Sequence, residues 1–112
     1  MIHKMNLVNS AFRAIVTGKK TVEMRLNDEK RKKIKVGDTI EFENIDTHQK
    51  VACAVISLAR YKDFFELYSH YDKTAIGYSE DEVADASDMY AYYSPELIEK
   101  YGALAIEVKV MF

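Results

Sequence analysis

Lys20, Glu23 and Arg25 lie close together in the sequence, and their side chains suit the recognition of a polar ligand. Glu23 and Arg25 are two residues apart in a stretch that alternates as a strand does. On a strand such residues point to one face and lie about 6.6 Å apart along it. The guanidinium can grip a phosphate or a carbonyl edge, and the carboxylate can orient it or accept protons. We therefore expect Lys20, Glu23 and Arg25 to line one cleft.

Structural interpretations of the same residues remain open. Glu23 and Arg25 can form an ion pair that only stabilises the fold, and Lys20 can be an ordinary solvated lysine. In the functional interpretation, the Lys20 ammonium reaches a phosphate, or the amine loses its proton when partly buried and acts as a base.

A basic segment follows this strand, although the whole chain has a net charge of −2. Residues 19–35 carry eight basic and three acidic side chains. Such a segment can concentrate a phosphate-bearing partner, and we expect it to strengthen RNA binding without specifying a sequence. The alternative is a solvated, charged connection. The side chains in question are Lys30, Arg31, Lys32 and Lys33.

Other chemistries lack their sequence signals. The three histidines are scattered, so no metal site is predicted, and no glycine-rich nucleotide loop is present, so no cofactor is expected. Cys53 lies in an apolar run and reads as a small buried hydrophobe. Tyr90, Tyr92, Tyr93 and Tyr101 could stack on bases, but the spacing of Tyr90 and Tyr93 equally suits a helix face that packs on the barrel, and we favour packing.

Periodicity predicts strands alternating with short helices. We expect strands over residues 2–7, 20–26, 39–45, 50–60 and 104–110. Helices are expected from Asn9 or Ser10, as N-cap, to Gly18, and over residues 64–68, 80–90 and 95–100. The helix over 80–90 would have Ser79 as N-cap and Glu82 in a capping box. These elements predict an α+β fold with a mixed or antiparallel sheet that curls into a barrel.

Length and composition predict one domain over residues 1–112. No apolar run approaches the length of a membrane span and no secretory signal is evident, so we expect a cytoplasmic protein. The sequence leaves the oligomeric state open.

Three segments resemble the ASCH domain family. The family motif G-x-K-x-x-E-x-R is matched by Gly18, Lys20, Glu23 and Arg25 within GKKTVEMR. The segments IKVGDTIEF and YYSPELIEKYGALAIEV are similar to later parts of bacterial members. The resemblance implies a PUA-like β-barrel flanked by short helices, with a cleft beside the motif that holds RNA or a nucleotide-like ligand.

The resemblance also implies an enzymatic alternative that needs no metal. Some ASCH proteins are amidohydrolases of N-acylated cytidine-type nucleosides, with a catalytic lysine, a threonine three residues later and a distant glutamate. Lys20 matches the lysine, but Glu23 occupies the threonine position, and no acid near residues 80–82 aligns securely. Thr21 would point away from Lys20 in a regular strand. Ribonuclease chemistry, with Lys20, Glu23 and Arg25 moving protons and stabilising phosphate, is a further possibility.

Overall fold

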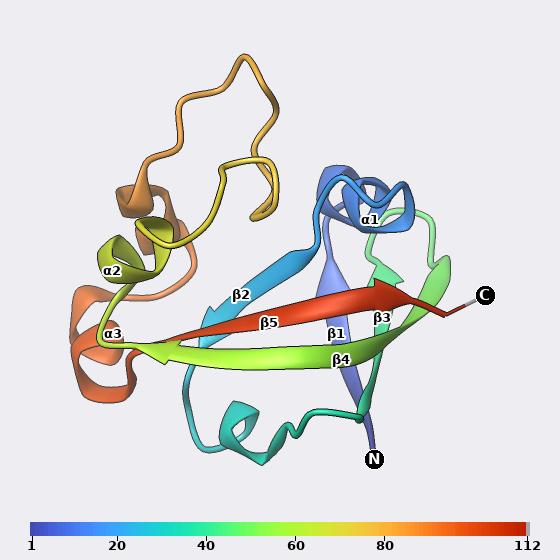
Figure 1. Ribbon diagram of the computed structural model, residues 1–112, viewed down its shortest axis with the longest axis horizontal. Coiled ribbons are helices and arrows are strands. Elements are labelled where there is room, and N and C mark those ends of the chain that lie inside the picture. The colour runs from blue at the N-terminus through green and yellow to red at the C-terminus, as the bar shows by residue number, and fades with distance from the viewer. Residues whose placement is uncertain (112) are drawn as a thin grey trace.

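The strand-forming segments build one five-stranded sheet in the order β1-β3-β4-β5-β2 (Figure 1). The structure is a computed structural model and describes residues 1–111. β1 pairs with β3 in parallel, and the other neighbouring strands pair antiparallel. The prediction of a mixed sheet is confirmed. The strands are β1 (Ile2–Leu7), β2 (Val22–Leu26), β3 (Thr39–Asn44), β4 (Lys50–Tyr61) and β5 (Ala103–Val110).

Short helices cover the curled sheet at two places (Figure 1). α1 (Asn9–Val16) packs Phe12 and Ile15 into one apolar cluster with residues of β1, β3, β4 and β5. A second cluster lies between β2, β5 and the remaining helices. These are α2 (Phe64–Tyr68), α3 (Pro95–Tyr101) and the 3-10 helix η2 (Ala86–Ala91), while the 3-10 turn η1 (Arg31–Lys33) lies before β3. The α+β class is as predicted. Cys53 is fully buried in β4, and burial raises the pKa of its thiol to about 11.

The N-terminus of α1 differs from the prediction. Val8 occupies the N-cap position and makes no side-chain cap, because the helix already begins at Asn9. The Asn9 amide instead donates to the Asp46 carboxylate, 3.2 Å away in the turn between β3 and β4. The predicted cap by Asn9 or Ser10 is therefore wrong, since a carboxylate distant in sequence takes its place.

The predicted helix over residues 80–90 is also wrong. Residues 79–82 form a turn in which the Ser79 amide donates to the Glu82 carboxylate at 2.7 Å. The Ser79 hydroxyl donates to Asp81 at 2.6 Å, and only η2 is helical in this segment. Serine and acidic side chains offer local hydrogen bonds that compete with a helix. The capping pattern was thus present, but no helix follows it directly.

The two ends of the sheet, β1 and β2, face each other across a seam that a side chain bridges. Arg25 Nη2 donates to the Asn6 carbonyl of β1 at 2.9 Å. The edge of β2 that does not pair with β5 carries the backbone groups of Val22 and Met24, because these groups alternate along a strand. On this edge the Val22 amide donates to the Ala75 carbonyl at 2.9 Å. The sheet is a half-barrel with an open seam.

Candidate functional site: a cleft beside the barrel seam

Lys20, Glu23 and Arg25 form a buried charged network at the start of β2. Lys20 Nζ lies 2.7 Å from Glu23 Oε1, and Arg25 Nε donates to Glu23 Oε2 at 2.8 Å. Glu23 is only 3% exposed and Lys20 only 8%. The carboxylate is therefore held between two cations and almost shielded from water.

The turn between α1 and β2 explains how Lys20 reaches Glu23. Gly18 takes a φ of +80° after α1, and the Lys20 amide donates to the Ala14 carbonyl at 3.0 Å. β2 begins only at Val22, so Lys20 precedes the regular pleat and can turn toward a residue three positions later. Within β2, Glu23 and Arg25 share a face, as the alternation predicted.

The network fixes the charge of Glu23. Burial alone would raise the pKa of this carboxyl, but the charges and hydrogen bonds of Lys20 and Arg25 outweigh burial and lower it. Glu23 is consequently a carboxylate at neutral pH, which orients Lys20 and Arg25 rather than donating a proton.

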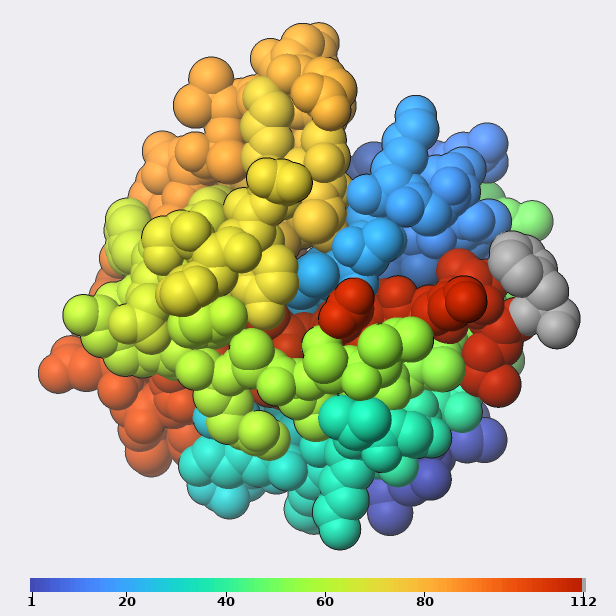
Figure 2. Space-filling model, viewed as in Figure 1, coloured from blue at the N-terminus to red at the C-terminus, as the bar shows by residue number. Residues whose placement is uncertain are grey.

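A cleft of about 620 Å³ opens above this network. One wall comes from the junction of β1 and α1, and the other comes from α2, η2 and the long loop after α2. Figure 2 shows the surface hollowed between that loop, in yellow to orange, and the α1 region in blue. The volume is in the range of small-molecule sites, roughly 300–1,000 Å³. The cleft can therefore enclose a ligand about the size of a nucleoside.

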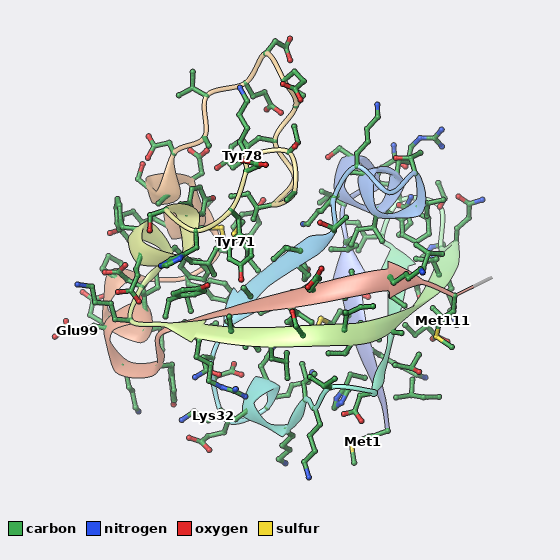
Figure 3. All side chains as sticks on the ribbon, in the orientation of Figure 1. Met1, Lys32, Tyr71, Tyr78, Glu99 and Met111 are labelled. Carbon is green, nitrogen blue, oxygen red and sulfur yellow. The ribbon has the colours of Figure 1, made fainter. Side chains whose placement is uncertain are left out.

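Tyrosines form much of the far wall. The Tyr68 and Tyr78 hydroxyls lie 2.9 Å apart, and the Tyr78 hydroxyl donates to the Asp88 carboxylate at 2.7 Å. The pKa of both phenols is raised, with burial as the largest cause, so both keep their protons at neutral pH. Tyr92 and Tyr93 also line the cleft, and Tyr92 is 70% exposed. In Figure 3, Tyr78 lies on the long loop, at the opposite end of the molecule from Lys32.

Family membership follows from a match over almost the whole chain. The sequence pattern of the ASCH domain matches residues 5–112. The chain belongs to the ASCH domain family. The resemblance of the three sequence segments is thereby confirmed.

Several solved structures resemble this ASCH domain. The crystal structure of hypothetical protein PH0355 has 30% identity and a TM-score of 0.84, with 99% of this chain and 100% of that chain covered. The solution structure of protein PF0455 from Pyrococcus furiosus has 29% identity and a TM-score of 0.77, with coverages of 99% and 98%. A comparison with curated proteins finds no match.

More distant ASCH structures share the fold. An ASCH mutant protein from Zymomonas mobilis has 19% identity and a TM-score of 0.69, with 96% of this chain and 67% of that chain covered. The ASCH domain from Lactobacillus crispatus has 12% identity and a TM-score of 0.70, with coverages of 97% and 79%. These similarities confirm the predicted PUA-like α+β fold.

The structure divides the basic segment of this ASCH domain. Lys30 and Arg31 line a second cavity of about 180 Å³, which also includes Arg25. Lys32 and Lys33 lie outside both cavities, and Lys32 is 3.5 Å from Glu29. Only half of the four basic residues thus lie beside the candidate site.

The aromatic residues are divided in the same way. Tyr93 stacks on Phe64 at a centroid distance of 6.0 Å, and Tyr90 lies against Phe65 at 6.3 Å, so the partners of both rings belong to α2. Tyr68 and Tyr78 were not singled out from the sequence, because they lie in segments that meet only in the folded chain. No local signal marks them.

Among residues 1–111, no group of three or more His, Cys, Asp or Glu side chains is arranged to hold a metal ion. Within the same residues, no helix has the length and apolar character needed to span a bilayer.

Gly77 lies against the Lys20 side chain, which gives a first testable prediction. A Cβ at Gly77 would lie 3.2 Å from Lys20 Cδ, and its φ of +114° disfavours other residues. Gly77→Ala should destabilise the protein by about 1–3 kcal/mol and push the Lys20 side chain away from Glu23. Thermal unfolding measures the loss of stability. Displacement of Lys20 should weaken ligand binding in the cleft, which a titration measures. Gly37→Ala is the control, because Gly37 has a φ of +93° with open space around it and lies in the turn before β3. Equal losses of ligand affinity in both variants would contradict this role.

Proposed function

We propose that this ASCH protein binds RNA or a nucleotide-like ligand and holds one nucleoside unit in the cleft. The observation that supports this most directly is the buried network of Lys20, Glu23 and Arg25 at the floor of a tyrosine-walled cleft. The network supplies oriented hydrogen-bond donors, and the walls supply aromatic surface. A planar, polar heterocycle matches both.

The tyrosines favour a base over a larger apolar ligand. Tyr92 lines the cleft and is 70% exposed, so aromatic surface remains uncovered there. Stacking of a base on such a surface is tolerant of sequence and contributes about 1–3 kcal/mol. The Met24 amide already donates to Glu23 Oε1 at 3.3 Å, so this edge of β2 offers a base the Met24 carbonyl as an acceptor.

The charges of the cleft favour a base and ribose inside it rather than a phosphate. Lys20 and Arg25 are both paired with Glu23, and the carboxylates of Glu82 and Asp88 also line the cleft. Two cations therefore face three carboxylates. A phosphate deep in the cleft would meet net negative charge.

A titration with short single-stranded RNAs and nucleoside monophosphates, without added metal, tests the proposal. Tyr92→Ala should weaken binding about tenfold, in line with the loss of one base stack. Tyr90→Ala is the matched control, because Tyr90 is 45% exposed but lies outside the cleft. An equal effect of the two substitutions, or none from Tyr92→Ala, would refute binding in the cleft.

Hydrolysis is the second candidate function, and the observation that favours it is that Lys20, which matches the lysine of the ASCH amidohydrolases, lines the cleft. The same samples should be incubated with N-acylated nucleosides and with short RNAs, alongside Lys20→Ala. We expect weak or absent turnover, because Glu23 holds Lys20 in an ion pair. In addition, Glu23 stands three residues after Lys20, where the amidohydrolases have a threonine. Lys20-dependent deacylation or RNA cleavage would reverse the order of the two functions.

A further inference from the structure

The second cavity continues the cleft along the barrel seam. Along β1, residues 3–6 line this cavity and residues 6–8 line the cleft. Arg25 and Asn6 belong to both. We call it the basic cavity, after its basic lining residues His3, Lys4, Arg25, Lys30 and Arg31.

The charge of the basic cavity is opposite to that of the cleft. No aspartate or glutamate is among its lining residues, whereas three carboxylates line the cleft. Three of its basic residues are paired with carboxylates outside the lining: Arg31 with Asp28 at 2.6 Å, His3 with Asp38 at 2.8 Å and Arg25 with Glu23 at 2.7 Å. Within residues 1–111, however, Lys4 and Lys30 form no ion pair, so their charges are available to a ligand. The basic cavity therefore favours an anion.

Arg25 lies where the two cavities meet and can contact a ligand that spans them. Its bonds to Glu23 and to the Asn6 carbonyl use Nε and Nη2, which leaves Nη1 for a ligand. A volume of about 180 Å³ has room for a phosphate group and some of its water. In a nucleotide the phosphate is bonded to the ribose, so consecutive sites for nucleoside and phosphate match its covalent structure.

We propose that the basic cavity is a phosphate subsite for the group attached to the nucleoside in the cleft. The inference rests on the proposed function and narrows its ligand to a phosphorylated nucleoside, either a free nucleotide or a nucleotide within RNA. Lys4 and Lys30 are its phosphate-binding residues, and a free nucleoside fills only the cleft.

Binding of ribonucleosides, their 5′- and 3′-monophosphates and a single-stranded hexaribonucleotide should be compared by titration calorimetry. We expect the better monophosphate to bind about tenfold more tightly than its nucleoside, since charged groups strengthen hydrogen bonds to phosphate. Lys4→Ala and Lys30→Ala should remove most of this preference and leave nucleoside affinity unchanged. Each substitution should also lower the salt dependence of hexanucleotide binding by about 0.7 in log–log slope.

Lys32→Ala is the matched control, because it removes the same charge two residues from Lys30 but outside both cavities. It should leave the phosphate preference intact. An effect equal to that of Lys30→Ala would show diffuse electrostatic attraction in place of a phosphate subsite.

Equal binding of nucleosides and monophosphates would overturn the subsite while the proposed function stands. If neither nucleosides nor nucleotides nor the hexanucleotide bind, the proposed function fails and the subsite fails with it. Preference for both monophosphates over the hexanucleotide would identify a free nucleotide as the ligand, and the reverse order would identify RNA.

Discussion

Replacing Glu23 with glutamine should lower the free energy of unfolding by about 3–5 kcal/mol, the usual cost of removing one partner from a buried ion pair. The carboxylate separates Lys20 from Arg25 and compensates both charges in a site that excludes most water. Glutamine has nearly the same shape but leaves two cations facing a neutral amide. Urea denaturation of both proteins at pH 7 gives the difference. The control is Glu43→Gln, whose partner His48 is exposed, and its effect should stay below about 1 kcal/mol.

The pH dependence of stability checks the same interaction. The folded pKa of Glu23 lies below its usual 4.5, so its ionised form adds stability at pH values above the unfolded pKa. That contribution is lost as the pH falls below about 4.5 and through the lowered folded pKa. The stability difference between the wild type and Glu23→Gln should therefore shrink on acidification. A difference independent of pH would show that packing, rather than charge, explains the loss.

Glu23→Gln also distinguishes an oriented site from a merely positive one. If the carboxylate holds Arg25 in position, RNA affinity should fall although a negative charge has been removed. A purely electrostatic surface would bind RNA more tightly after the same change. Tighter binding would remove Glu23 from the binding site and leave it a structural role.

Gly102→Ala should cost about 2–5 kcal/mol of stability, from backbone strain together with a steric clash. Gly102 joins α3 to β5 with a φ of +79°, and a Cβ there would lie 2.7 Å from the Tyr61 carbonyl oxygen of β4. The residue cannot move aside easily, because its amide donates to Ile98 and its carbonyl accepts from Asn27. Thermal or urea unfolding measures the loss.

Gly37→Ala separates the two parts of this effect. Gly37 has a φ of +93°, but a Cβ there would meet nothing within 4 Å. Its substitution therefore reports strain alone, about 1–3 kcal/mol. Similar losses at both positions would mean that the contact with β4 is unimportant.

The strands and the charged network could be predicted because both depend on local spacing. The period of two placed Glu23 and Arg25 on one face, and a helix end at Gly18 placed Lys20 beside them. The far wall of the cleft could not be predicted. Tyr68, Tyr78 and Asp88 belong to three separate segments that tertiary packing brings together.

The wrong predictions also arise from contacts that local spacing does not show. The capping pattern at Ser79 predicted a helix, but polar side chains closed a local turn instead. The cap of α1 comes from Asp46, which no pattern near residue 9 reveals. The sequence predicted that the basic segment acts as one unit. In the structure, Lys30 and Arg31 line the basic cavity, whereas Lys32 lies outside it.

The open seam leaves the edges of β1 and β2 unpaired with each other, which bears on strand addition by another chain. A sheet that does not close leaves two strand edges on which another chain can add a strand. Here β2 is five residues long, its Val22 amide is occupied by Ala75, and the Asn6 carbonyl of β1 is occupied by Arg25. Each edge thus has a backbone group that is already bonded at the seam, so a strand added on either side would lose part of its hydrogen-bond ladder. The seam is therefore a poorer template for strand addition by another polypeptide than a fully free edge.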